Sequence, residues 1–221
     1  MKRSLRLQFS RAAKTYEKWA IPQKESARIL VELVKPFGKV LDLGCGTGFV
    51  SEFLRECKVI GLDLSESMVR AYRERFGVGV VGNAEELPFK DESFDFVLSN
   101  FALHWTDWKK SIKEALRVSK VGVGVAIPVE GSVSFSNFPF PKVEEVLQSF
   151  KPELYEIREI EIPFRGLELI KFFHYTGTAN YEGKKETLSR KELEKLAREL
   201  KSEKFVVLFI YISKDRPKGG I

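Results

Sequence analysis

Two aspartates and three closely spaced glycines are the residues whose types and spacing best suit ligand chemistry. Asp42 lies in a short apolar run, and Gly44, Gly46 and Gly48 follow it in a G-x-G-x-G pattern. Asp63 lies near the end of the next apolar run. A carboxylate at the C-terminal tip of a strand can accept both hydroxyls of a ribose in charge-assisted hydrogen bonds. These five residues therefore predict a nucleoside-binding site.

The glycines must lie in a turn between a strand and a helix. Val40, Leu41 and Leu43 belong to an apolar run too short for a helix, which predicts a buried strand, and the segment 49–56 has helical spacing. Glycine permits the positive φ and the close backbone approach that such a turn needs. Strand, glycine loop and helix in this order open a nucleotide-binding α/β domain. A generic glycine turn beside a surface aspartate is the alternative.

The glycine spacing argues against a dinucleotide. A dinucleotide loop has the pattern G-x-G-x-x-G, and here the third glycine, Gly48, comes one residue earlier. We therefore do not expect the loop to bind NAD.

The remaining apolar patterns predict an α/β fold with a doubly wound sheet. One or two N-terminal helices are expected over 9–35, broken near Pro22. Strands are expected at 59–64, 78–81, 93–100, 121–127, 155–162 and 205–212, and helices at 65–76, 108–118, 142–150, 167–175 and 189–200.

Length and composition favour one α/β domain over residues 1–221. No apolar run approaches the ~18 residues that span a bilayer, and the first residues lack the apolar stretch of a signal peptide. We expect a cytoplasmic protein with no membrane segment. Cys45 and Cys57 are the two cysteines, and we expect free thiols and no metal site, since His104 and His174 are the only histidines.

The chain carries a formal net charge of +6. One interpretation is a solvated Lys/Glu-rich surface of the kind found in heat-stable proteins. The other is an acidic partner, either nucleic acid or an acidic carrier protein.

The glycine loop and its acids resemble the class I S-adenosylmethionine-dependent methyltransferases. In that family D-x-G-x-G-x-G, here Asp42 to Gly48, opens the cofactor site, and an acid on the second strand, here Asp63, holds the ribose. The resemblance implies S-adenosyl-L-methionine as cofactor and S-adenosyl-L-homocysteine as product. It also implies a doubly wound, Rossmann-like, seven-stranded and mostly parallel sheet with a C-terminal antiparallel strand, covered by an N-terminal helical lid over 1–35.

The resemblance also implies a set of cofactor-binding residues, some of which have structural alternatives. Tyr16 can be a half-buried core aromatic, Met68 a core filler, and Asn83 part of a strand-end turn. The implied set is Arg11, Tyr16, Asp42, Gly44, Cys45, Gly46, Asp63, Leu64, Met68, Asn83, Ala84, Glu85 and Asn100.

Several segments resemble more closely the malonyl-[acyl-carrier-protein] O-methyltransferases of biotin synthesis. These segments are Phe9 to Glu17, Ser99 to Trp105, Gly131-Ser132, Ile170 to Ala179 and Leu188 to Arg190. The segment after the fifth parallel strand is shorter than in that family. The family's Lys-Gly-x-Gly turn is replaced by His174-Tyr-Thr-Gly. These two departures concern the substrate contacts.

The closer resemblance implies O-methylation of the free carboxylate of a malonyl group on an acidic acyl carrier protein. Residues 129–200 would form the substrate side, with Trp105, Lys171 and His174 near the acceptor and Tyr16 and His104 as catalytic candidates. His104 is equally well explained as a structural histidine. Basic residues at the carrier surface would be Lys184, Lys185, Arg190 and Lys191, which can also be simply solvated.

Two other functions stay open. One is methylation of a free small molecule, with His104 as base for a hydroxyl or amine. The other is a cofactor-binding module without turnover. A nucleic-acid substrate is not expected, because Asn100 is not followed by the Pro-Pro-aromatic signature of amide and adenine methyltransferases.

Overall fold

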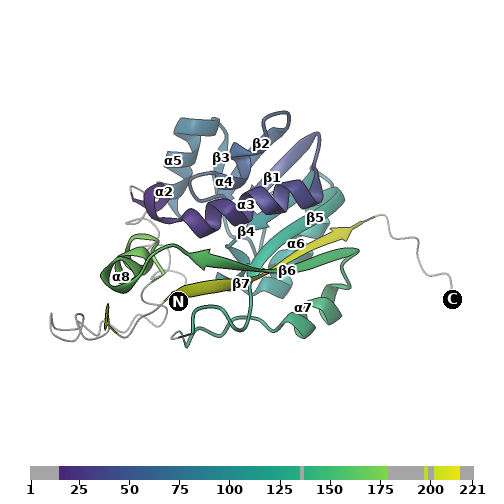
Figure 1. Ribbon diagram of the computed structural model, residues 1–221. Helices are drawn as coiled ribbons and strands as arrows, with labels where there is room; N and C mark the ends of the chain where they lie inside the picture. Colours follow the sequence, from purple (N-terminus) through teal and green to yellow (C-terminus); the bar gives the residue numbers. More distant parts are fainter. Residues whose placement is uncertain (1–14, 135–136, 179–196, 199–201, 215–221) are drawn as a thin grey trace.

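The computed structural model describes residues 15–134, 137–178, 197–198 and 202–214 (Figure 1). Arg11 and the expected docking residues Lys184, Lys185, Arg190 and Lys191 lie outside the described residues. So does most of the helix expected at 189–200. Among the described residues, no helix combines the length and the apolar character needed to cross a bilayer.

The described strands form a seven-stranded sheet with the order β3-β2-β1-β4-β5-β7-β6. Strand β7 runs antiparallel to both of its neighbours, and the other pairs are parallel. The expected α/β architecture with an antiparallel C-terminal strand is therefore confirmed. The strands are β1 (Lys39–Leu43), β2 (Lys58–Asp63), β3 (Gly79–Val81), β4 (Phe94–Asn100), β5 (Ser119–Pro128), β6 (Leu154–Ile162) and β7 (Glu203–Ser213).

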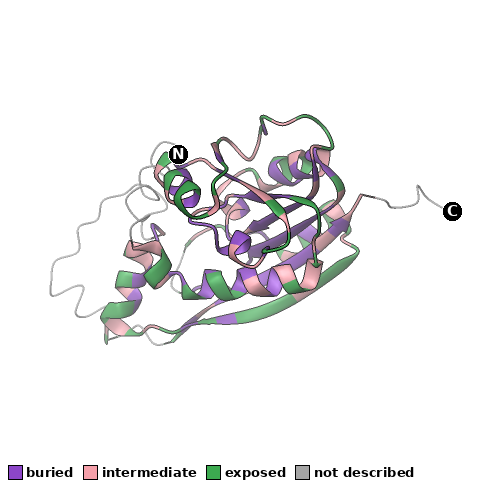
Figure 2. Ribbon diagram, turned by 90° about the horizontal axis from the view of Figure 1, so that it is seen from above, coloured by how far each residue is buried: buried purple, intermediate pink, exposed green. Residues whose placement is uncertain are grey.

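Helices cover both faces of this sheet (Figure 1). One core cluster joins the sheet to α3, α4 and α8, and the other joins it to α6 and α7. Figure 2 shows that buried residues follow the central strands and the inward sides of the helices. The helices are α2 (Tyr16–Trp19), α3 (Ile21–Val34), α4 (Phe49–Glu52), α5 (Glu66–Phe76), η1 (Leu103–Trp105), α6 (Trp108–Val118), α7 (Val143–Phe150) and α8 (Gly166–Tyr175).

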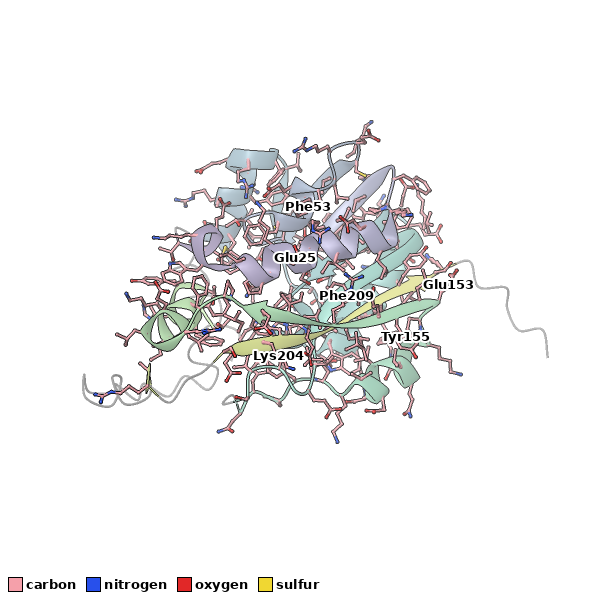
Figure 3. All side chains as sticks on the ribbon, in the orientation of Figure 1. Glu25, Phe53, Glu153, Tyr155, Lys204 and Phe209 are labelled. Atoms are coloured by element: carbon pink, nitrogen blue, oxygen red, sulfur yellow. The ribbon has the colours of Figure 1, made fainter. Side chains whose placement is uncertain are left out.

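The two strands at one edge of the sheet, β7 and β6, differ in burial. Phe209, labelled on β7 in Figure 3, is fully buried in the cluster under α3. Tyr155, labelled on the neighbouring edge strand β6, is 59% exposed. The start of β6 therefore forms an exposed rim, whereas its end, with Ile160 and Ile162, belongs to the buried core.

The strand order reverses between β1 and β4. Strands β2 and β3 extend the sheet on one side of β1, and β4 and β5 extend it on the other. The loops that leave the carboxyl ends of β1 and β4 therefore diverge and open a crevice, which is where α/β proteins bind ligands. Gly44 follows β1, and Asn100 ends β4, so both lie at this crevice.

The helix after the glycine loop is shorter than predicted. The spacing indicated a helix over 49–56, whereas α4 covers only Phe49–Glu52. The N–H groups of Phe53 and Leu54 donate to carbonyls three residues back, those of Val50 and Ser51, so the last turn tightens. The chain then turns at once into β2.

A buried hydrogen-bonded chain joins β1, α4 and α5. Asp42 Oδ2 accepts from the N–H of Ser51 at 3.2 Å and from Ser51 Oγ at 2.7 Å. Ser51 Oγ lies 2.7 Å from the hydroxyl oxygen of Tyr72. Asp42 is only 1% exposed, and this burial raises the pKa of its carboxyl to about 7, against the opposing effect of the Ser51 hydrogen bonds.

Because of this network, the free energy of unfolding should depend on pH. The folded-state pKa of Asp42 lies above its unfolded value of ~3.9. Its contribution to the free energy of unfolding is therefore complete below pH ~4 and is lost as the pH rises through about 7. Asp42→Asn, which keeps an acceptor for Ser51, should reduce this loss by about 2–4 kcal/mol between pH 4 and 8. Urea unfolding across this pH range measures the effect.

The matched control is Asp91→Asn, since the Asp91 side chain is 75% exposed. That variant should follow the pH profile of the unmodified protein. If Asp42→Asn and the unmodified protein lose stability in parallel between pH 4 and 8, Asp42 is ionised in the fold and the prediction is wrong.

Candidate functional site

A cavity opens at the carboxyl ends of β1, β2 and β4. Most of the cofactor residues expected from the sequence line it, and so does Trp105. The predicted residues in its wall are Tyr16, Asp42, Gly44, Cys45, Gly46, Asp63, Leu64, Met68, Asn83, Ala84, Asn100 and Trp105.

The glycine loop brings bare backbone to the cavity wall. Gly44 has φ +72°, and a Cβ there would lie 2.2 Å from the Cβ of Ala102. Gly46 has φ +52°, and a Cβ there would meet no atom within 4 Å. Gly44 is therefore required for packing between the loops, whereas at Gly46 the missing side chain leaves open space beside the backbone.

Asp63 is held in place by backbone donors. Its Oδ2 accepts from the N–H of Gly46 at 3.0 Å, and its Oδ1 accepts from the N–H of Ser65 at 2.7 Å. Burial raises the pKa of this carboxyl, while the backbone N–H groups oppose that rise. Each oxygen retains acceptor capacity, so the carboxylate can bind a pair of ligand hydroxyls without moving.

Asn83 forms the strand-end turn considered from the sequence and also borders the cavity. Its Oδ1 accepts from the N–H of Glu85 at 3.2 Å, which is a turn-forming contact, and the residue also lines the cavity. Met68 is 2% exposed and lines the same region, so it packs in the core and borders the cavity. These residues form the end of the cavity next to β3.

Tyr16 on α2 forms part of the cavity wall. Its ring stacks on Phe49, with the ring centroids 5.8 Å apart. Burial and the charge of Asp63 raise the pKa of its hydroxyl, so Tyr16 is a hydrogen-bond donor and not a base at neutral pH. Trp19, one turn away, stacks on Tyr175 of α8 at 5.3 Å, and Thr15 Oγ1 donates to the Tyr175 carbonyl.

His104 lies behind the cavity wall and not in it. Its ring packs against Trp105 at 4.8 Å and against Phe138 and Phe140 at 5.6 and 6.0 Å. Within the described part of the chain its Nδ1 has no hydrogen-bond partner. Burial lowers the pKa of His104 to about 3, so the ring is neutral. This environment is that of a structural histidine.

Three other predicted residues do not line the cavity. Glu85 instead accepts from the N–H of Asp107 at 3.1 Å through its Oε1. Lys171 and His174 lie on α8 with exposed side chains. The structure thus groups most of the cofactor candidates at the cavity, leaves Glu85 out of its lining, and separates them from the α8 candidates for the acceptor.

The cavity also contains residues that the sequence analysis missed. Gln23 on α3 lines it, although it is only 3% exposed, and so does Phe101, whose φ of +52° is unusual for a residue with a side chain. A signal for Gln23 was available, because Gln23 and Ser26 interrupt an otherwise apolar helix face that includes Ala27 and Leu30.

The chain is similar to known methyltransferases in sequence. Residues 41–127 match the family model described as a methyltransferase domain. A malonyl-[acyl-carrier protein] O-methyltransferase of Hamiltonella defensa is 33% identical over 150 residues, which cover 65% of this chain and 55% of that protein. Further bacterial relatives at 32–36% identity carry the same description. The chain spans about half the length of these curated relatives.

Solved structures agree in fold. An S-adenosylmethionine-dependent methyltransferase of Thermotoga maritima has a TM-score of 0.62 at 23% identity, covering 94% of this chain and 99% of that one. A Haemonchus contortus phosphoethanolamine N-methyltransferase, solved with S-adenosylhomocysteine, has a TM-score of 0.60 at 19% identity, covering 87% and 53%. Residues 41–127 therefore carry a methyltransferase domain, and the sheet order and the glycine-lined cavity are those of the class I S-adenosylmethionine-dependent methyltransferase fold.

Proposed function

We propose that this chain transfers a methyl group to a carboxylate, with the malonyl group of an acidic acyl carrier protein as acceptor. The observation that carries this proposal is the environment of His104, which is neutral and turned into an aromatic cluster behind the cavity. An acceptor that arrives already ionised needs no base. The names of the bacterial relatives support the same acceptor.

The residues of the cavity fit the family's cofactor. Asp63, with both oxygens oriented by backbone N–H groups, would hold the ribose hydroxyls, and Asn83 and Met68 would border the adenine. The open space beside Gly46 accommodates a ligand against bare backbone. The bound cofactor supplies an electrophilic methyl group on a sulfonium.

The protein's contribution to such a transfer is mainly position and exclusion of water. A carboxylate with a pKa near ~4 is ionised at neutral pH, so no proton has to be removed. Tyr16, Phe49, Phe101 and Trp105 contribute aromatic surface to the cavity lining, and the rings of Tyr16 and Phe49 stack on each other. Holding nucleophile and methyl group at ~3–3.5 Å can lower the barrier by several kcal/mol.

A free small acid is the second candidate acceptor. It is favoured by the partial coverage of the relatives, of which the chain spans 55%. It is also favoured by the exposed positions of Lys171 and His174, outside the cavity lining. In either case the acceptor is a carboxylate.

A methyl-transfer assay tests the proposal. Malonyl carrier protein, malonyl-CoA and a panel of small acids, phenols and amines are each offered with S-adenosylmethionine. Turnover highest with malonyl carrier protein supports the proposal, and efficient methylation of a phenol or amine with no carboxylate turnover contradicts it. Tight cofactor binding without turnover on any acceptor indicates a cofactor-binding module.

Asp63 should control cofactor affinity. Asp63→Ala removes charge-assisted hydrogen bonds and should weaken binding of S-adenosylhomocysteine by about 1.5–3 kcal/mol, measured by calorimetry. The exposed Asp91 again provides a control, and Asp91→Ala should leave affinity unchanged. Unchanged affinity in a folded Asp63→Ala protein would remove the proposed ribose contact.

His104 should contribute little to the rate. His104→Gln should retain most of kcat, and the pH–rate profile should have no basic limb attributable to a histidine, because an ionised carboxylate needs no base. A large loss of kcat that follows an ionisation near pH ~6–7 would instead support a hydroxyl or amine acceptor.

The carrier protein should bind partly through charge. Attraction between exposed basic residues and an acidic carrier is screened over ~8–10 Å, so KM for malonyl carrier protein should rise with salt while KM for the cofactor stays nearly constant. Reversal of Lys184 and Lys185, which lie outside the described residues, to Glu should raise the carrier KM with little change in kcat. The KM for malonyl-CoA serves as the control, and an equal rise there would argue against carrier docking.

A further inference from the structure

Two amide side chains in the cavity have a carbonyl oxygen without a hydrogen-bond partner. Gln23 is 3% exposed and lines the cavity, and its Oε1 accepts no hydrogen bond within the described residues. Asn100 also lines the cavity, and its buried Oδ1 is likewise unpaired among them. A buried polar atom without a partner is unfavourable, so these two oxygens indicate a missing hydrogen-bond donor.

A hydrogen bond fixes the orientation of one of these amides. Asn100 Nδ2 donates to the backbone carbonyl of Gln23 at 2.9 Å. The amide nitrogen of Asn100 is thereby identified, and the other terminal atom must be its oxygen. The same bond ties the first turn of α3 to the end of β4, so Gln23 and Asn100 are neighbours in one wall.

This wall lies away from the nucleoside end of the cavity. Asp63 ends β2 and Asn100 ends β4, with β1 between them. Two strand spacings separate these ends by about 10 Å. With the ribose at Asp63 and the adenine toward Asn83, the opposite end of the cofactor, its amino-acid moiety, is the part left for the Gln23 wall.

The charges of the cavity indicate which group of that moiety, the ammonium or the carboxylate, faces the Gln23 wall. Asp42 and Asp63 line the cavity, and none of its described lining residues is a lysine or arginine. An ammonium group has three donors and no acceptor, whereas a carboxylate has only acceptors and would face the amide oxygens unfavourably. Both the unpaired atoms and the acidic wall therefore suit a cation.

We propose that Gln23, together with Asn100, binds the ammonium group of the cofactor's amino-acid moiety. Gln23 is then a cofactor-selectivity residue supplied by the N-terminal helical segment, outside the glycine-loop motif. This inference concerns the cofactor and is independent of the identity of the acceptor.

A truncated ligand tests the proposal by calorimetry. S-adenosylhomocysteine carries the amino-acid moiety, and 5′-methylthioadenosine lacks it. Gln23→Met, of similar length, should weaken S-adenosylhomocysteine by about 10-fold, as expected for a lost hydrogen bond to a charged group, and 5′-methylthioadenosine by less than about 2-fold. Asp63→Ala is the control, since it should weaken both ligands by a similar factor.

Charged substitutions distinguish an ammonium from a carboxylate. Gln23→Glu should keep S-adenosylhomocysteine affinity at least about 5-fold above that of Gln23→Lys, because only the carboxylate can accept from an ammonium. Thermal melts without ligand identify variants that fail to fold. If Gln23→Met fails to fold, the comparison of Gln23→Glu with Gln23→Lys still tests the proposal. Equal weakening of both ligands by Gln23→Met, or tighter binding by Gln23→Lys than by Gln23→Glu, would overturn the proposal.

Discussion

The reversal of strand order between β1 and β4 is the constraint on which the site depends. Because β2 and β4 flank β1, the loops after these strands diverge and leave their backbone groups facing a common crevice. The hydrogen bond from the Gly46 N–H to Asp63 Oδ2 then joins the β1 loop to the end of β2. The bond from Asn100 Nδ2 to the Gln23 carbonyl joins the end of β4 to α3. Each wall of the cavity is thus tied to a strand end.

The cavity contains negative charge in a buried setting. Asp42 is 1% exposed and Asp63 has its pKa raised by burial, yet both accept hydrogen bonds from Ser51 or from backbone N–H groups. The backbone N–H groups partly offset the desolvation of Asp63 without adding a positive charge as a lysine would, whereas Asp42, with a pKa of about 7, carries only part of its charge at neutral pH. The arrangement costs folding stability and favours a cationic ligand, which agrees with a family whose cofactor carries a sulfonium.

The cavity wall on the N-terminal side is connected to the helix that follows β6. Tyr16 contacts Phe49 at the cavity, and Trp19 of the same short helix stacks on Tyr175 of α8. Helix α2 has only four residues, which is too short to be stable alone, so these contacts must hold it in position. The cofactor side and the α8 side of the molecule are therefore in physical contact through one turn of helix.

The sequence by itself determined most strands of the sheet, the glycine loop and the place of Asp63 beside that loop. Apolar periodicity and glycine spacing are local, and a parallel sheet brings its carboxyl strand ends together in any protein of this topology. Asp63 could therefore be placed at the cavity from its position alone, whereas Asn83 and Met68 were expected there from the family resemblance.

Only the tertiary structure decided the surroundings of Gln23 and His104 and the length of α4. Gln23 is one polar residue on a helix face, and its contact with Asn100 spans 77 positions, which no local pattern encodes. His104 follows a strand end as catalytic residues often do, but its ring packs against four aromatic neighbours, two of them from the 138–140 loop. Helix α4 ended early because the bonds of its last turn and the entry into β2 outweighed helical spacing. In each case the deciding interaction was made with residues distant in the sequence or with backbone geometry, neither of which residue type alone specifies.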